Sequence, residues 1–230
     1  MKRFWKTAKA ARQDGGWGIA LDGRAVRTPA RAPLIVASEP LARAIAAEWQ
    51  GQGETVDPAA MPLTGIANAA IDLAAPDPAA FAAPIAAYAE SDLLCYRDDR
   101  DAALQAEQAA AWNPLLAWAE GRHGVEFALA QGVLPVDQPK ATVAALKGAV
   151  HALDPFRLAA LSPLVTIGGS LVAGLALAER AFDADALWQA VSLDERYQER
   201  RWGTDGEAQA MRARREADWH NAARFLELLE

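Results

Sequence analysis

Cysteine is almost missing from this chain: Cys95 is the only one among 230 residues. A disulfide within the chain and a thiolate metal cage are therefore excluded, and a reducing compartment is expected. Histidine is scarce as well. None of His123, His151 and His220 stands at metal-ligand spacing from another histidine, a cysteine or paired carboxylates. We expect no metal site.

The chain also lacks long apolar runs. Its most apolar stretch, 164–178, contains Gly168, Gly169 and Ser170 and falls short of the roughly 20 residues that a membrane-spanning helix needs, so it predicts a buried core helix. The basic start, Met1-Lys2-Arg3, is not followed by the apolar segment of a signal peptide. The formal net charge of -7 argues against nucleic acid as the main ligand. We expect a soluble, cytoplasmic protein.

Phosphate-binding motifs are absent too. The segment 15–18 (Gly-Gly-Trp-Gly) lacks the third spaced glycine of a dinucleotide loop, and no predicted strand precedes it. Gly168-Gly169-Ser170 has no following lysine, so tight helix packing is the better interpretation of those glycines. Cys95 could act as a nucleophile only with a distant histidine folded against it, and a lone cysteine is more often a small buried apolar residue. We expect neither catalysis nor a cofactor.

Alternating apolar and polar residues predict strands in the first third of the chain. The segment 17–28 is interrupted by Asp22-Gly23, which favours a tight hairpin turn because both positions accept positive φ. Residues 34–36 predict a third strand. A small antiparallel sheet needs a helix over one face, and Ser38 is a suitable N-cap for such a helix.

Helical periodicity dominates the rest of the chain. Segments 91–96 and 125–129 are short exceptions: the first is ambiguous between strand and helix end, and the second favours a short strand. Asp154-Pro155 and Ser162-Pro163 each predict a cap followed by a helix start. After the first helix, the next are expected at 62–73 and from a cap at Asp77 to about Glu90. The others are expected at 102–122, 140–152, 155–161, 163–181, 184–202 and 205–229.

This pattern predicts an α+β fold with two domains. Residues 1–90 would form a small antiparallel β-containing domain, and residues 91–230 a larger orthogonal helical bundle. With 52% apolar and 23% charged residues, the chain can bury a real core and is not of disordered composition.

Eight tryptophans are many for this length. Most should lie in the core, with a minority as exposed binding anchors. The stripe of greatest interest follows helical steps of three and four and turns from apolar to polar: Trp188, Val191, Glu195, Gln198 and Trp202. A carboxylate on such a face must be paired, neutralised or offered to a partner. Two structural alternatives stay open: an internal ion pair of Glu195 with Arg212 or Arg215, and a capping box formed by Thr204 and Glu207.

Short motifs in order from residue 4 to about 228 resemble those of one protein family, the assembly chaperones that bind the alpha subunit of F-type ATP synthase. Each motif is weak alone, and their ordered combination is specific. They are Phe4-Trp5-Lys6, Leu21-Asp-Gly-Arg24, Arg27-Thr-Pro29, Glu48-Trp49-Gln50 with Gln52, Met61-Pro-Leu-Thr64, Ala70-Ile-Asp72, Ser91-Asp-Leu-Leu-Cys-Tyr96, Gln108 with Trp112-Asn-Pro-Leu-Leu116, Gly169-Ser170-Leu171, Asp194-Glu195, Gln198, Trp202-Gly203 and Glu207.

The resemblance implies a non-catalytic chaperone, monomeric when free, that shields the free alpha subunit until the beta subunit replaces it. The missing transit peptide points to a bacterial relative of the mitochondrial members. The last motifs imply a partner-binding site at Asp194, Glu195, Gln198, Trp202, Gly203 and Glu207. Two rival interpretations are a small-molecule enzyme with an unrecognised interdomain site and a scaffold subunit that stays in the mature complex.

Overall fold

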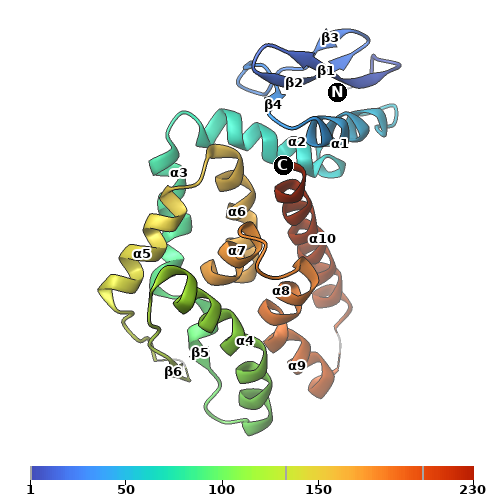
Figure 1. Cartoon of the computed structure of the whole chain (residues 1–230). Coiled ribbons are helices and arrows are strands. Elements are labelled where there is room, and N and C mark those ends of the chain that lie inside the picture. The colour runs from blue at the N-terminus through green and yellow to red at the C-terminus, as the bar shows by residue number, and fades with distance from the viewer. Residues whose placement is uncertain (1, 133, 204) are drawn as a thin grey trace. The chain divides into compact units, whose positions relative to one another are not determined.

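The computed structural model describes residues 2–132, 134–203 and 205–230. The chain divides into two compact units. The first comprises Met1–Phe81, Asp154–Ala160 and Asn221–Glu230, and the second comprises Ala82–Leu153 and Leu161–His220. The fold is α+β, with a small antiparallel sheet near the N-terminus and mostly helix thereafter (Figure 1). The domain boundary predicted near residue 90 stays a proposal.

The sheet of the first unit is organised around one strand. Strand β2 pairs antiparallel with each of the other three; the strands are β1 (Ala8–Gln13), β2 (Gly16–Leu21), β3 (Arg24–Ala25) and β4 (Ile35–Val36). The turn between β2 and β3 confirms the predicted hairpin, since Asp22 and Gly23 have φ of 48° and 84°. Strand β1 was not predicted, because its alanines and long polar side chains have little preference for strands.

Helix α1 (Glu39–Gln50) packs against β1 and β2, as expected of the covering helix (Figure 1). It begins at the predicted cap: the Ser38 hydroxyl accepts a hydrogen bond from the Leu41 amide at 3.3 Å. The side chains at the centre of this contact are almost fully buried; they are Ile19, Leu34, Leu41 and Ile45. The Glu48 carboxylate accepts bonds from the amides of Leu63 and Thr64 at 2.7 and 2.8 Å, and so caps helix α2 (Pro62–Ala69).

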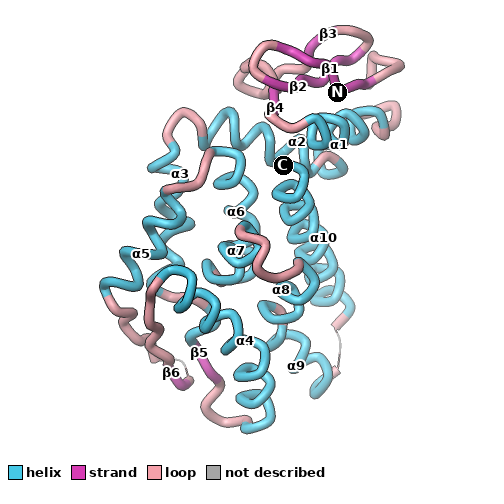
Figure 2. Tube along the Cα trace, in the orientation of Figure 1, coloured by secondary structure: helices cyan, strands magenta, loops and turns pink. Residues whose placement is uncertain are grey.

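The rest of the chain is almost all helix, with β5 (Tyr96–Arg97) and β6 (Ala130–Gln131) as a short parallel pair (Figure 2). After α2 come a π-helix (Ala70–Ala74), short 3-10 turns and the remaining α-helices. These are α3 (Pro78–Ala86), α4 (Ala102–His123), α5 (Lys140–His151), α6 (Pro155–Gly168), α7 (Leu171–Ala178), α8 (Ala184–Val191), α9 (Leu193–Trp202) and α10 (Gly206–Leu228). Within the described part of the chain, no helix has the length and apolar character needed to cross a membrane.

The strand predicted at 125–129 is wrong. Side chains satisfy its backbone instead: the Gln138 amide group bonds to both the N–H and the carbonyl of Ala128, at 3.0 and 2.8 Å. The Thr142 hydroxyl does the same for Glu126, accepting from its N–H at 3.2 Å and donating to its carbonyl at 2.6 Å. With these groups already paired, the segment needs no neighbouring strand.

The helix start predicted at Ser162-Pro163 is also wrong. Helix α6 runs through Pro163. A proline removes one helical hydrogen bond, and here its neighbours Leu161, Leu164 and Val165 are fully buried, so packing holds the helix together. The break falls later, at Gly169, whose φ of 67° suits glycine.

Helix α7 then forms the centre of the second unit's core. Its residues Leu171, Val172, Ala173, Leu175 and Ala176 are at most 1% exposed. The Ser170 hydroxyl accepts a hydrogen bond from the Ala173 amide at 3.0 Å, and the buried Asp92 carboxylate accepts one from the Val172 amide at 2.9 Å. The expected buried helix is thus present, shorter than predicted and capped by two buried side chains.

The helix predicted over 184–202 is two helices with Ser192 between them. The Ser192 hydroxyl donates to the Trp188 carbonyl at 2.7 Å, and such bonding to the preceding turn bends helices. The indole N–H of Trp112 donates to the Ala190 carbonyl at 2.8 Å and so occupies an oxygen that would otherwise serve the helix. The predicted stripe from Trp188 to Trp202 therefore changes direction halfway.

Candidate binding site

Helix α9 is polar on nearly all sides, and Leu193 is its only buried residue. Such a helix gains little from burying apolar surface. It lies beside the start of α10, and the two enclose a hollow of about 390 Å³, here called the α9–α10 groove. Its lining includes four of the six predicted partner-binding residues. The lining residues are Glu195, Gln198, Glu199, Trp202, Gly203, Asp205, Ala208, Met211, Arg212 and Arg215.

Two ion pairs cross this groove. Arg215 Nη1 lies 2.5 Å from Glu195 Oε1, and Arg212 pairs with Glu199. The internal pair of Glu195 with Arg215, one of the alternatives open from sequence, is therefore confirmed. The Glu195 side chain nonetheless keeps 45% of its surface exposed, so this pair stabilises the fold by at most about 1 kcal/mol.

Arg215 has a second anchor, because its Nη2 donates to the Ile167 carbonyl at 3.1 Å. It would hold its position if Glu195 turned to another cation. Glu195 uses only Oε1 in the bonds among the described residues. The carboxylate is thus placed to accept a further donor from outside, and charge-assisted bonds of this kind are strong and directional.

Large apolar side chains stand at the edge of the same groove. Trp202 is 73% exposed and Met211 is 59% exposed, whereas most tryptophans of the chain are buried or half-buried. Tryptophan, methionine and arginine are enriched where proteins bind one another. The α9–α10 groove therefore combines an exposed tryptophan with two ion pairs.

Asp194 lies outside this groove. Its Oδ1 accepts a hydrogen bond from the Gln108 side chain at 2.9 Å, and Gln108 in turn accepts from the Asp98 amide at 2.8 Å. Burial raises the pKa of Asp194, although the Gln108 bond opposes this shift. The structure therefore gives Asp194 an internal role in joining α9 to α4.

Gly203 and Glu207 lie at the end of α9 and at the start of α10. Gly203 ends α9 with a φ of 89°, and its amide donates to the Glu199 carbonyl at 3.0 Å. Glu207 lies exposed in the first turn of α10 and does not line the groove. The predicted capping box depends on Thr204, which lies outside the described residues.

Sequence reasoning missed the wall contributed by α10. Its groove residues Ala208, Met211, Arg212 and Arg215 stand at steps i, i+3, i+4 and i+7 on one helix face. That spacing is visible in the sequence, but a mixed face of alanine, methionine and arginine has no distinctive periodicity. The sequence pointed only to Arg212 and Arg215, as ion-pair partners of Glu195.

Other motif residues serve the fold. Asp72 accepts a bond from the Thr28 hydroxyl at 2.6 Å and one from the Ala30 amide at 3.0 Å. Cys95 is buried, and burial raises the pKa of its thiol to about 12, so it stays protonated at neutral pH. Over the ranges that the structure describes, no cluster of His, Cys, Asp and Glu side chains could hold a metal ion.

The fold and the open α9–α10 groove define an α+β protein with a candidate binding surface. Comparisons with known proteins identify its family. Residues 2–120 match the family model described as ATP12 chaperone protein. The chain is 25% identical over 215 residues to the mitochondrial protein atp12 of Schizosaccharomyces pombe, covering 88% of this chain and 74% of that protein.

Solved structures extend the likeness to the whole chain. The crystal structure of Atp12 from Paracoccus denitrificans is 42% identical, with a TM-score of 0.94 and coverage of 100% of this chain and 98% of that one. A point mutant of the same protein gives the same values. A protein of Agrobacterium tumefaciens is 39% identical, with a TM-score of 0.94, and covers 100% and 86%. The chain belongs to the ATP12 chaperone family, which confirms its resemblance to the ATP synthase assembly chaperones.

Proposed function

We propose that this protein is a non-catalytic chaperone that binds the free alpha subunit of ATP synthase through the α9–α10 groove and releases it to the beta subunit. The observation that carries the proposal is the exposed Trp202 beside the half-exposed Glu195–Arg215 pair. Family membership supports the chaperone role. Likeness to bacterial structures supports a cytoplasmic setting, and we expect a monomer when the client is absent.

The physical need for such a chaperone is plain. A subunit destined for a ring exposes large apolar interfaces before its neighbours arrive, and such patches aggregate. A protein that covers the patch stabilises its client by mass action. It needs no nucleotide for this, and release requires only that a competing subunit bind the same patch more tightly.

The groove is built for reversible binding. In the free chain Arg215 satisfies Glu195, so an exposed carboxylate is not left unpaired. When a client arginine arrives, it can take the place of Arg215, which keeps its bond to the Ile167 carbonyl. Because the pair between Glu195 and a client arginine forms at the expense of the pair with Arg215, the net gain in affinity is limited. Moderate affinity suits a chaperone that must hand over its client.

The experiment mixes purified protein with free alpha subunit and follows light scattering at equimolar ratio without ATP. We expect wild-type protein to suppress aggregation. Glu195→Gln should bind the alpha subunit at least tenfold more weakly, about 1.4 kcal/mol, because the amide cannot form a charged pair with a client arginine. Its thermal midpoint should stay nearly unchanged, since the pair with Arg215 is half-exposed.

Glu90→Gln is the matched control. Glu90 forms a surface pair with Lys147 at the same 2.5 Å separation and with a 60% exposed side chain, but lies away from the groove. It should bind the alpha subunit like the wild type. Suppression that required ATP hydrolysis by this chain would refute the proposed function. A sharp fall in the thermal midpoint of Glu195→Gln would instead assign Glu195 to the fold and move the client surface elsewhere.

A further inference from the structure

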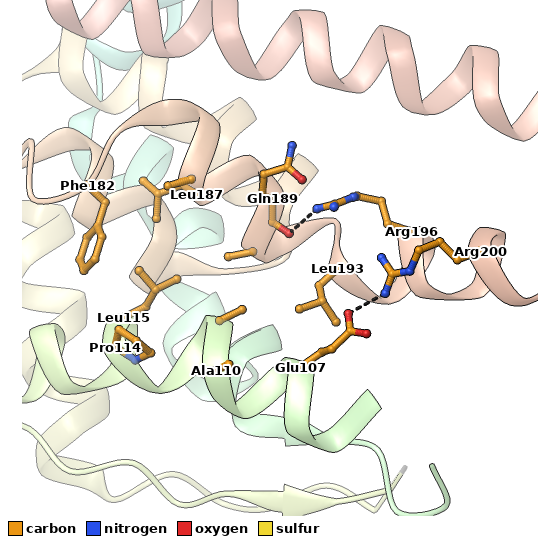
Figure 3. A pocket seen from close by; sticks show the side chains of 13 residues that line it. Glu107, Ala110, Pro114, Leu115, Phe182, Leu187, Gln189, Leu193, Arg196 and Arg200 are labelled. Atoms are coloured by element: carbon orange, nitrogen blue, oxygen red, sulfur yellow. Dashed lines mark hydrogen bonds and ion pairs between the residues drawn. The ribbon is translucent and has the colours of Figure 1, made fainter. Parts of the chain in front are cut away.

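A second groove opens on the other side of α9, between α4 and α8 (Figure 3). It has a volume of about 560 Å³, within the range of sites that hold ligands. Its lining is mostly apolar and comes from three helices and the loop before α8. We call this hollow the α4–α8 groove; it is lined by Glu107, Ala110, Ala111, Pro114, Leu115, Phe182, Ala186, Leu187, Gln189, Ala190, Leu193, Arg196 and Arg200.

The groove follows the length of α4. The α4 residues that line it, from Glu107 to Leu115, stand at steps i, i+3, i+4, i+7 and i+8 on one face. Eight residues of helix rise about 12 Å. Leu187 and Leu193 lie buried beneath the groove. Its exposed apolar surface includes Ala110 and Pro114 on α4 and Ala186 on α8. Small walls permit close approach of another backbone.

Two polar groups in this groove, the Arg196 guanidinium and the Ala110 carbonyl, have fewer hydrogen-bond partners than they could bind. Arg200 is paired with Glu107 at 2.6 Å, but Arg196 makes no ion pair within the described ranges, and its Nη1 donates only to the Gln189 carbonyl, at 3.3 Å (Figure 3). Pro114 has no N–H, so the Ala110 carbonyl loses its ordinary helical donor. The groove thus offers a half-buried cation and a backbone acceptor beside small exposed apolar side chains.

We propose that the α4–α8 groove docks a short amphipathic helix of the client, with aliphatic side chains against the exposed Ala110, Pro114 and Ala186 and a carboxylate on Arg196. The length of the groove fits the i, i+3 or i+4, i+7 anchors of helix-in-groove recognition, and the uncompensated guanidinium selects an acidic residue at its edge. This inference rests on the proposed function, because it takes the alpha subunit as the client.

The two grooves share α9. Leu193, Arg196 and Arg200 face the α4–α8 groove, while Glu195 and Trp202 face the α9–α10 groove. A client that occupies both would contact α9 on two sides. The two contacts would also have opposite charge requirements, with a client cation at Glu195 and a client anion at Arg196.

The test measures the affinity of the alpha subunit for variants of this protein in which a tryptophan fills the α4–α8 groove. Ala110→Trp should weaken binding at least tenfold, because the indole occupies the space meant for the client helix. Ala144→Trp is the matched control: Ala144 is an exposed alanine of α5 outside both grooves, and its variant should bind within twofold of wild type. Arg196→Glu should also lose at least tenfold, and Arg196→Lys should recover part of that loss.

Three outcomes separate the claims. If Ala110→Trp lowers the thermal midpoint, Ala186→Trp on α8 takes its place in the comparison. Wild-type protein that retains alpha subunit, together with filled-groove variants that bind it equally well, would overturn this inference and leave the proposed function standing. Wild-type protein that retains no alpha subunit would overturn both. Variants that only abolish self-association of the chain would assign the groove to a second copy and overturn the client inference.

Discussion

Helices α8 and α9 follow one another with only Ser192 between them, yet they lie in opposite environments. Four residues of α8 are buried, against Leu193 alone in α9. Trp188 is 2% exposed and Trp202 is 73% exposed. A single stripe in the sequence therefore begins in the core and ends at the surface. The difference separates side chains that are packed in the core from side chains that are exposed to solvent.

The strongest test of this comparison is Trp188→Ala. The Trp188 ring lies 5.9 Å from that of Trp219, and both are almost fully buried. Removing a buried tryptophan leaves a cavity and typically costs about 3–5 kcal/mol. We expect a loss of this size in urea unfolding at unchanged m-value, with alpha-subunit affinity preserved in the molecules that stay folded. A loss below about 1 kcal/mol would mean that α8 is not part of the core.

The two carboxylates Asp92 and Glu195 extend the comparison to charged groups. Glu195 is half-exposed and paired. Asp92 is 1% exposed and accepts hydrogen bonds from the Leu94 and Val172 amides at 3.0 and 2.9 Å. Burial raises the pKa of Asp92 to about 6, against the opposing effect of those amides. Asp92 therefore binds its proton more tightly in the folded chain than in the unfolded one.

The sign of the resulting pH dependence follows from that shift. The contribution of Asp92 to stability is full below its unfolded pKa of about 3.9 and is lost as pH rises through about 6. Between pH 4.5 and pH 8 the loss amounts to about 2 kcal/mol. Subtracting the unfolding free energy of Asp92→Asn from that of wild type at each pH isolates this group. We expect the difference to fall with pH by about that amount, and a difference that rises would show that the amides outweigh burial.

Much of the fold could be predicted because its signals are local. Asp22-Gly23 forms the predicted hairpin turn, and Ser38 caps the first helix as predicted. The break at Ser192 was not predicted, since one of the two hydrogen bonds that mark it comes from Trp112, 78 residues away from the Ala190 carbonyl. The strand predicted at 125–129 was wrong for a similar reason: the side chains of Gln138 and Thr142 bind its backbone in place of a neighbouring strand.

The candidate site shows the same limit. A carboxylate on an apolar stripe directed attention to Glu195, and its pairing with Arg215 was one of the alternatives open from sequence. Neighbours in the sequence do not share its surroundings, however: Asp194 faces Gln108 on α4. Periodicity along one helix locates a face, but which second helix covers that face is decided by tertiary packing. The contribution of Met211 to the groove was therefore not predicted.

The smallest change in stability is expected for Trp202→Ala, and this variant tests the contrast between α8 and α9 most directly. Trp202→Ala removes the same side chain as Trp188→Ala, fourteen positions further along the stripe. Because Trp202 is 73% exposed, its loss creates no cavity, and the free energy of unfolding should change by less than about 0.5 kcal/mol. Alpha-subunit affinity should fall at least tenfold, because an exposed tryptophan at a binding surface becomes buried only when the partner binds. Urea unfolding and a binding titration on the same preparation measure both quantities. A large stability loss with unchanged affinity would reverse the roles assigned to the two tryptophans and place the client surface away from α9.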